Sequence, residues 1–443
     1  MTGNGSLAGL DEVAAVVTPV AERFADAGHR LFLVGGVVRD LLLASEQGTD
    51  LPGNDVDLTT DARPEQIKAL LEPLADVIWA QGERFGTIGA RVGGRAIEIT
   101  THRAEAYDPD SRKPVVSFGD DIAGDLARRD FTVNAAAIEL PGGQLHDPHR
   151  GLVDLRDRLL RTPLSAEISF TDDPLRMLRA ARFIARFGLT PTPDLVAAAT
   201  ELASRLDIVS VERVADELER LLAVARPRAG FEFLRRTGLL DHVVPTLGSV
   251  AAEVHDRAIA LASVEPPPSG PTDTAGSAVG ATQVLVRRAG LLWPVRAEAT
   301  AELGRLRYSK AETVRTDHLL RAVEIGLGGE PGPATVRRLA ADVGVDGLVG
   351  AASLAINLVE VGEADHQRVR QLVELIDRLA ANEDLTDLDG PLSGAEVMEL
   401  LDLSPGPEVG RALSHLRQLR IERGPLDPGQ ARAELVDWWR NRS

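Results

Sequence analysis

Two aspartates separated by one residue stand at the start of a short segment of β character. Asp55 and Asp57 belong to DVDLTT, whose alternating residues predict a strand. Residues two apart in a strand face the same way, with Cα atoms roughly 6.5–7 Å apart. Mg²⁺ in proteins binds few carboxylates together with substrate phosphates, and paired ions can clamp both reacting oxygens of a phosphoryl displacement. The pair predicts a catalytic Mg²⁺ site, although a lone DVD is also typical of a solvated strand end.

A third carboxylate lies in a second alternating segment, RAIEITTH. Glu98 stands between Ile97 and Ile99 there. If both isoleucines point into a core, Glu98 points to the opposite face of the sheet. We therefore expect Glu98 to face the same side as the aspartates from a neighbouring strand, as a further catalytic carboxylate.

A glycine pair interrupts the apolar sequence LFLVGGVVRD. Gly35 and Gly36 allow a ligand to approach the backbone, and a helix starting there would direct free N–H groups at an anion. The segment lacks both the GK[ST] sequence of a P-loop and the spacing of a dinucleotide fingerprint. Taken alone, residues 35–40 fit a plain strand–turn–helix joint as well as a phosphate site. Their closeness in sequence to the aspartates favours the phosphate site.

Four arginines follow Pro174 at helical spacings of three, three and four residues. They are Arg176, Arg179, Arg182 and Arg186. We expect Thr171 or Asp172 to cap this helix, with Pro174 in its first turn. The spacing predicts one stripe of charges, and only Asp173 stands beside it. Four unpaired guanidinium groups on one face favour a polyanionic ligand, with an ordinary solvated helix face as the alternative.

The first residues of this stripe also suit the reading of a nucleobase. Asp173 only accepts hydrogen bonds and Arg176 only donates them. Cytosine and adenine both present an amino donor beside a ring-nitrogen acceptor, whereas uracil and guanine present a carbonyl beside a ring N–H. The pair therefore predicts selection of CTP and ATP without a template.

The elements that must hold these residues predict an α+β fold. A small mixed β-sheet extends to about residue 140, after an amphipathic helix that ends at Gly28. From about residue 152 the pattern is helical. Residues 265–281 are rich in Pro, Gly and Ser and predict a connector, and residues 382–394 predict a second boundary.

The composition narrows the classes of function. The 443 residues include no cysteine, which excludes disulfides, thiol catalysis and Cys-ligated metal sites. A net charge of −18 argues against indiscriminate coating of nucleic acid. The chain begins without a basic leader and has no run of 18 apolar residues, so we expect no membrane association and a cytoplasmic location. The sequence leaves the oligomeric state open.

Six motifs, in order over residues 30–222, resemble those of the class II tRNA nucleotidyltransferases (CCA-adding enzymes) and the related bacterial poly(A) polymerases. They are GGVVRD with DVD, IEITTHR, DLARRDFTVNAAAIEL, HDPHRGLVDLRDRLLR, DDPLRMLRAARF and VERVADELERLL. The resemblance implies addition of C, C and A to the 3′ end of tRNA from CTP and ATP, with release of pyrophosphate. Alternatives are a poly(A) polymerase, a partial CC- or A-adding enzyme, a small-molecule nucleotidyltransferase and an inactive RNA-binding scaffold.

The resemblance also implies roles for single residues. It assigns two Mg²⁺ ions to Asp55 and Asp57. The triphosphate and sugar are assigned to Gly36, Arg39 and Arg129. Base selection is assigned to Asp173 and Arg176, with supporting nucleotide contacts from Arg179 and Arg182. Asp172 departs from the glutamate usual in this motif, and residues 101–118 resemble the flexible loop that lets the pocket change from C to A.

Four parts are implied: a nucleotidyltransferase head (1–150), a helical neck (151–225), a helical body (226–385) and a helical tail (386–443). The body and tail are expected to hold the acceptor stem and elbow of tRNA. Relatives often carry a His-Asp phosphohydrolase module in the body, but Trp293-Pro294 stands where its His-Asp pair is expected. The doublets at His255 and His318 are typical of ordinary helix surface, so we expect neither metal nor phosphatase activity in the body.

Overall fold

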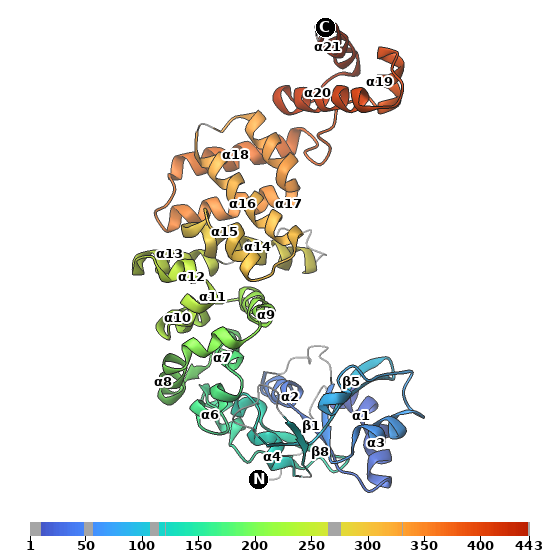
Figure 1. Cartoon of the computed structure of the whole chain (residues 1–443), viewed down its shortest axis with the longest axis vertical. Helices are drawn as coiled ribbons and strands as arrows, with labels where there is room; N and C mark the ends of the chain where they lie inside the picture. The colour runs from blue at the N-terminus through green and yellow to red at the C-terminus, as the bar shows by residue number, and fades with distance from the viewer. Residues whose placement is uncertain are drawn as a thin grey trace. The chain divides into compact units, whose positions relative to one another are not determined.

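The computed structural model describes residues 10–47, 56–106, 115–119, 121–264, 276–329 and 331–441. Asp55 and the centre of the expected flexible loop lie outside these ranges. The chain divides into two compact units, residues 1–208 and 209–443. Figure 1 shows their elements, and each unit is considered by itself.

A seven-stranded mixed sheet forms the centre of the first unit, in the order β3-β4-β5-β2-β1-β8-β9. The parallel pair is β2 with β5, and the other neighbours run antiparallel. The predicted mixed sheet is therefore confirmed. Its strands are β1 (Leu31–Val34), β2 (Val56–Thr60), β3 (Val77–Trp79), β4 (Thr87–Val92), β5 (Arg95–Thr101), β8 (Ala137–Leu140) and β9 (Leu145–His146).

The two faces of this sheet have different partners. α1 (Leu10–Asp26) and α3 (Pro64–Leu71) pack on one face, where Leu31 and Leu33 of β1 join the main core. Phe32 and Val34 point the other way, into a smaller cluster with α4 (Ile122–Ala127). The alternation of β1 thus gives both faces an apolar layer. α1 ends before Gly28, whose φ of 80° lies in the left-handed region, as expected for a glycine stop.

Short helices complete the first unit. They are α2 (Gly36–Gln47), α5 (Gly151–Arg156), α6 (Ala166–Asp172), α7 (Leu175–Phe187) and α8 (Pro193–Glu201). The expected cap of the arginine helix is wrong, because Thr171 and Asp172 form the last turn of α6 and not the start of α7. Pro174 is the N-cap of α7, and the Asp173 carboxylate accepts a hydrogen bond from the Leu175 N–H at 3.3 Å. The sharp break arises because a residue before proline disfavours helical backbone.

The described part of the second unit is entirely helical. Its longer helices are α9 (Val211–Leu222), α10 (Arg228–Arg236), α13 (Ala252–Ala262), α14 (Gly276–Leu292), α16 (Lys310–Leu327), α17 (Pro333–Glu360), α18 (His366–Asn382), α19 (Gly394–Leu401), α20 (Pro407–Arg423) and α21 (Pro428–Arg440). α14 begins inside the expected connector, so residues 276–281 are helical and only 265–275 lie outside the description. The predicted boundary after Asn382 separates α18 from α19, and α19 to α21 share a small core of their own.

By length and composition, α17 is the one helix in the described ranges that is long and apolar enough to cross a membrane. Gly344 interrupts it with φ 72° and ψ 172°. Leu354 and Leu358 are fully buried, and α17 contacts α14, α16, α18 and α20. We interpret α17 as a core helix of the second unit.

Arginine networks hold the second unit together. Arg287 is fully buried, and its guanidinium donates to the carbonyls of Leu222 (2.6 Å), Val224 (2.5 Å), Ala225 (2.9 Å) and Val264 (2.9 Å). It therefore satisfies carbonyls at the end of α9 that have no helical partner.

A second network joins three helices. Glu383, directly after α18, accepts hydrogen bonds from Arg337 of α17 at 2.9 Å and from Arg420 of α20 at 2.7 Å. All three side chains are at most 7 % exposed. The two guanidinium groups hold the pKa of Glu383 below its usual range, against the effect of burial, which raises it.

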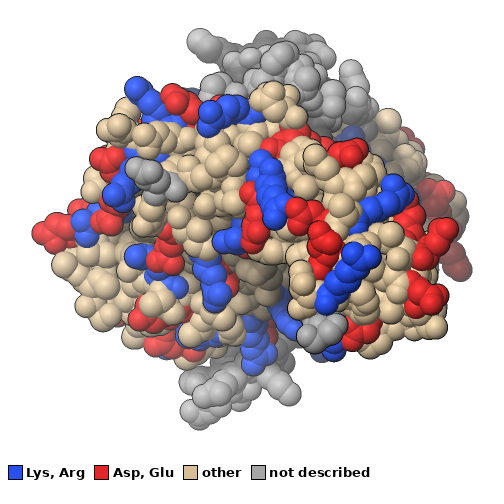
Figure 2. Space-filling view, turned by 90° about the horizontal axis from the view of Figure 1, so that it is seen from above, with Lys and Arg blue, Asp and Glu red and all other residues tan. Residues whose placement is uncertain are grey.

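Other arginines of the chain lie at the surface in local ion pairs. Basic and acidic side chains are interspersed over the face drawn in Figure 2. Three such pairs in the last helices are Arg411–Glu408, Arg423–Glu434 and Arg432–Glu396. Neighbouring carboxylates thus balance part of the positive charge of the arginines.

Candidate active site

Asp57 and Glu98 are Cα partners on the adjacent parallel strands β2 and β5. Their sequence neighbours Val56, Leu58 and Ile97 are buried in the main core, whereas both carboxyl side chains are exposed on the opposite face. Both line one cavity of about 280 Å³. The expectation that Glu98 faces the same side as the Asp57 carboxylate is confirmed.

The far wall of this cavity comes from α4 and the residues after it. Asp125, Arg128 and Arg129 line it opposite the strands. The Arg129 guanidinium donates to the Asp125 carboxylate at 3.2 Å. Asp125 and Arg128 were not identified from the sequence, although the i, i+4 spacing of Asp125 and Arg129 in DLARRDF was an available signal.

The glycine turn lies directly beside these groups. A Cβ atom built on Gly35 would stand 3.1 Å from Nη1 of Arg129 and 3.6 Å from Oδ2 of Asp57, and the φ of Gly35 is 78°. Glycine thus provides both the backbone conformation and the space that this turn requires. Among the described residues, the buried Nε of Arg129 has no hydrogen-bond partner. The glycine turn, the Asp57 carboxylate and the Arg129 guanidinium, which has an N–H group still available to donate, therefore lie next to one another.

Arg39 does not line this cavity. It is 5 % exposed, and its guanidinium donates to Asp40 at 2.8 Å and to Asn134 at 2.6 Å. Its Cζ also lies 4.2 Å from the ring centroid of Phe187 in α7. Burial lowers the pKa of Arg39, and Asp40 opposes that effect. In this structure Arg39 ties α2 to α7, and its contact with a triphosphate stays a prediction.

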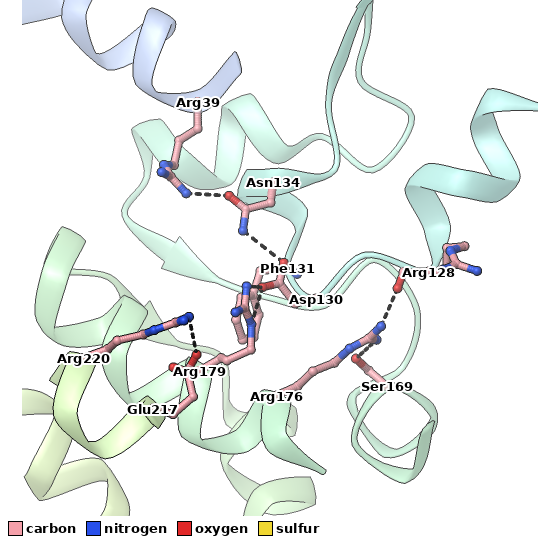
Figure 3. A network of polar contacts seen from close by, with 10 residues as sticks. All are labelled: Arg39, Arg128, Asp130, Phe131, Asn134, Ser169, Arg176, Arg179, Glu217 and Arg220. Atoms are coloured by element: carbon pink, nitrogen blue, oxygen red, sulfur yellow. Dashed lines mark hydrogen bonds and ion pairs between the residues drawn. The ribbon is translucent and has the colours of Figure 1, made fainter. Parts of the chain in front are cut away.

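Asp130 is a largely buried centre of hydrogen bonds that the sequence did not reveal (Figure 3). Its carboxylate accepts from Arg179 at 3.0 and 2.6 Å, from the Asn134 amide at 3.0 Å and from the Phe131 N–H at 2.9 Å. Burial raises the pKa of Asp130, but Arg179 and the other donors hold it below its usual range. The expected stripe of four unpaired guanidinium groups is therefore wrong at Arg179.

The other stripe arginines also differ in their surroundings. Arg176 donates to the Ser169 hydroxyl at 2.8 Å and to the Arg128 carbonyl at 2.5 Å. Each bond uses one N–H group, and a guanidinium carries five. Arg182 is only 8 % exposed and lies over the Phe183 ring, whereas Arg186 is exposed. The arginines of α7 thus differ in their exposure to solvent, and the helix does not present a uniform charged face.

The donor set of the cavity fits Mg²⁺. Asp57 and Glu98 supply hard carboxylate oxygens side by side on an open polar face, which is what Mg²⁺ needs when substrate phosphates supply the other ligands. In the described ranges, which omit Asp55, no group of three or more His, Asp or Glu residues is arranged to hold a metal by itself. The role of Asp55 remains a prediction.

The two doublets of the helical body make ordinary local contacts. His255 has its Nε2 2.5 Å from the Leu247 carbonyl and 3.7 Å from Asp241, and His318 has its Nδ1 2.9 Å from the Asp342 carbonyl. Trp293 is buried beneath the Arg296 guanidinium. The absence of metal and phosphatase activity stays a prediction.

Comparison with known proteins matches this architecture. The family described as "Poly A polymerase head domain" matches residues 31–161, and "Probable RNA and SrmB- binding site of polymerase A" matches residues 188–249. The CCA-adding enzyme of Lactobacillus gasseri is 36% identical over 235 residues, covering 53% of this chain and 56% of that protein. The enzyme of Geobacillus stearothermophilus is 37% identical over 221 residues, covering 50% and 52%. The matched region thus spans about half the length of these relatives.

Solved structures extend the likeness over nearly the whole chain. The Bacillus stearothermophilus CCA-adding enzyme in complex with CTP has a TM-score of 0.71 and 25% identity, covering 97% of this chain and 98% of that one. The Thermotoga maritima CCA-adding enzyme complexed with tRNA shares the fold, with a TM-score of 0.65, 18% identity and coverage of 97% and 96%. The chain is therefore similar in sequence to CCA-adding enzymes over about half of its length, and it shares their fold over nearly all of it.

Proposed function

We propose that this protein adds C, C and A in turn to the 3′ end of tRNA, using CTP and ATP and releasing pyrophosphate. The observation that carries the proposal is the register of Asp57 with Glu98, beside the glycine turn at Gly35 and the Arg129 guanidinium. This arrangement combines carboxylates for hard cations with a backbone turn and a cation for phosphate oxygens. Relatives whose sequences match this part of the chain are CCA-adding enzymes.

In this proposal the 3′-hydroxyl of tRNA attacks the α-phosphate of the bound nucleotide, and pyrophosphate leaves. Asp55, Asp57 and Glu98 would hold Mg²⁺, which when bound lowers the pKa of the hydroxyl and neutralises the triphosphate. Arg129 and the N–H groups after Gly35 would bind phosphate oxygens. Positioning and charge neutralisation suffice for this chemistry, so the reaction needs no covalent enzyme intermediate.

Base selection is proposed for Asp173 and Arg176. The bonds of Arg176 to Ser169 and to the Arg128 carbonyl fix its guanidinium while leaving N–H groups for a base acceptor. Asp173 lies in the sharp joint between α6 and α7, next to Arg176 in sequence. Because α7 is also bonded to Asp130, the pair rests on a fixed support.

The four parts expected from the sequence belong to the same proposal. The helical second unit would hold the acceptor stem and elbow of tRNA by shape and backbone contacts, as duplex RNA requires. The proposed location is the cytoplasm, where tRNA and both nucleotides are available. Residues 103–106 and 115–118 form a hairpin, β6 with β7, at the base of the expected flexible loop.

The deciding experiment is incorporation of labelled CTP or ATP into tRNA that lacks its 3′ end, in the presence of Mg²⁺. The expected product is longer by C, C and A and then stops. A product that continues with A residues alone would instead identify a poly(A) polymerase, the alternative that the matched head family also favours. Binding of tRNA without incorporation of any nucleotide would refute the proposal and favour an RNA-binding scaffold.

A further inference from the structure

A row of paired residues crosses the sheet from the candidate active site to its edge. Asp57 pairs with Glu98, Glu98 with Gly89 of β4, and Gly89 with Trp79 of β3. Residues that are directly opposite in neighbouring strands have side chains on the same face. Trp79 therefore stands on the face that carries the two carboxylates. Two strand spacings put its backbone roughly 10 Å from that of Glu98.

The missing side chain at Gly89 gives the indole of Trp79 its position. A Cβ atom built on Gly89 would stand 1.9 Å from Nε1 of Trp79 and 2.2 Å from Cε2. The indole therefore lies over the Gly89 backbone, along the row towards Glu98. Any other residue at this position would push the ring away. The indole ring thus fills the space beside Glu98 that a side chain at position 89 would otherwise occupy.

This indole borders a groove of about 470 Å³, separate from the carboxylate cavity except for Glu98, which lines both. The other wall carries Phe85, whose side chain is 42 % exposed although it is large and apolar. The guanidinium of Arg84 lies 4.5 Å from the Phe85 ring centroid. Gln81 and Thr87 add hydrogen-bonding groups. The groove thus combines two aromatic rings, a nearby cation and polar groups.

We propose that this groove binds the 3′-terminal nucleoside of the RNA acceptor, with its base against Trp79 and its 3′-hydroxyl directed to Glu98. Base stacking on aromatic side chains is the common mode of binding unpaired RNA and is tolerant of base identity. That tolerance suits an acceptor whose last residue changes with each addition. The inference rests on the proposed function, because it takes RNA as the acceptor.

The incoming nucleotide is a poorer occupant of this groove. The proposed phosphate-binding residue Arg129 lines the other cavity that contains Glu98, bounded by β2 and α4, and Gly35 lies next to Arg129 and Asp57 there. The proposed base-selecting residues, Asp173 in the joint between α6 and α7 and Arg176 in α7, do not line the groove. Glu98 thus stands between the two substrates, where a catalytic carboxylate is needed.

The test measures binding of an RNA hairpin with an unpaired 3′-terminal nucleotide, by fluorescence anisotropy and without CTP or ATP. A second hairpin carries an abasic ribose at that terminal position. The full-length protein is expected to bind the abasic RNA about tenfold more weakly, from the loss of one stacked base. Trp79→Leu keeps an apolar side chain but should remove that difference, and Trp79→Phe should restore most of it.

Val77→Ala is the matched control, because Val77 lies on the same edge strand and is 56 % exposed but does not line the groove. It should keep the tenfold difference. If Trp79→Leu also keeps it, or if Trp79→Leu raises only the KM for CTP, the proposal is overturned. Asp57→Ala separates the two hypotheses, because it should abolish incorporation and leave the binding difference unchanged. A wild-type protein that shows the difference but no incorporation would refute the proposed function alone.

Discussion

Arg179 donates two hydrogen bonds to a single carboxylate oxygen of Asp130, at 3.0 and 2.6 Å, across 49 residues of sequence. The Asp130 side chain is 10 % exposed and the Arg179 side chain 30 %, so water partly compensates the charge left on Arg179 when Asp130 is neutralised. Because a hydrogen bond to a charged group contributes about 1.5–3 kcal/mol, Asp130→Asn should lower the free energy of unfolding by about 2 kcal/mol near neutral pH. Urea unfolding followed by circular dichroism measures the change.

The same pair predicts a pH dependence. The pKa of Asp130 is held below its usual range, so its contribution to stability is fully present above the unfolded pKa and is lost as the pH falls through the folded pKa. The stability difference between wild type and Asp130→Asn should be constant from about pH 8 to 5 and narrow below about pH 4. A difference that grows with acidity would contradict the assigned ion pair.

Loss of the paired carboxylates should stop the chemistry and spare the fold. Asp57→Ala or Glu98→Gln removes an exposed carboxylate that we propose binds Mg²⁺, and metal ligation contributes several kcal/mol to the transition state, so incorporation should fall more than about a hundredfold. Asp55→Ala should behave in the same way. Thermal melting should shift little in each case. Retained incorporation by any variant would remove that residue from the metal site.

Gly35→Ala tests the close approach in the turn. The new Cβ would meet Arg129 and Asp57 and would also adopt a positive φ, which costs roughly 1–2 kcal/mol for an alanine. Gly28→Ala is the matched control, since its φ is 80° but no atom lies within 4 Å of the new Cβ. Both variants should lose similar stability, but only Gly35→Ala should raise the KM for CTP. Equal effects on KM would show that the turn does not contact the nucleotide.

Arg176→Ala tests base selection. Ser169 and the Arg128 carbonyl hold its guanidinium, whose remaining N–H groups we propose bind the base. Removal of the guanidinium should therefore reduce discrimination among the four nucleoside triphosphates. Ser169→Ala removes only one support and should change selection less. Competition of UTP and GTP against CTP in single-nucleotide incorporation measures the ratio. Unchanged selection in Arg176→Ala would refute the role of this residue.

Arg287→Met tests the buried cation of the second unit. Four carbonyl groups would lose their donor, and each unsatisfied buried group costs about 1–3 kcal/mol, so a loss of at least about 3 kcal/mol is expected. Arg228→Ala is the control, because Arg228 pairs with Glu232 at the surface, where such pairs contribute about 1 kcal/mol or less. Comparable losses in both variants would contradict the structural role of Arg287.

The sequence predicted the features that depend on local pattern. Alternation in β2 and β5 was enough to place Asp57 and Glu98 on one face, because the strand period is fixed by backbone geometry. The glycine stop at Gly28 followed from the same kind of local rule. The parts of the site that depend on such rules were therefore visible without a structure.

Features that depend on distant partners were not predicted. The spacing of Arg179 says nothing about Asp130, which reaches it only through the packing of α7 against the segment after α4. Likewise, the sequence pattern placed the start of the arginine helix at Thr171 or Asp172, whereas these residues end the preceding helix α6. Tertiary contacts decide both cases, and a single sequence does not record them.

Consecutive hydrogen bonds connect Arg39 to Asn134, Asn134 to Asp130 and Asp130 to Arg179 within the first unit. They fasten the helix after the glycine turn to the helix that carries Arg176. Altering nucleotide preference by transplanting the α7 segment from a relative would therefore also disturb the glycine turn. A successful chimaera has to bring compatible residues at 130 and 134 with the new helix.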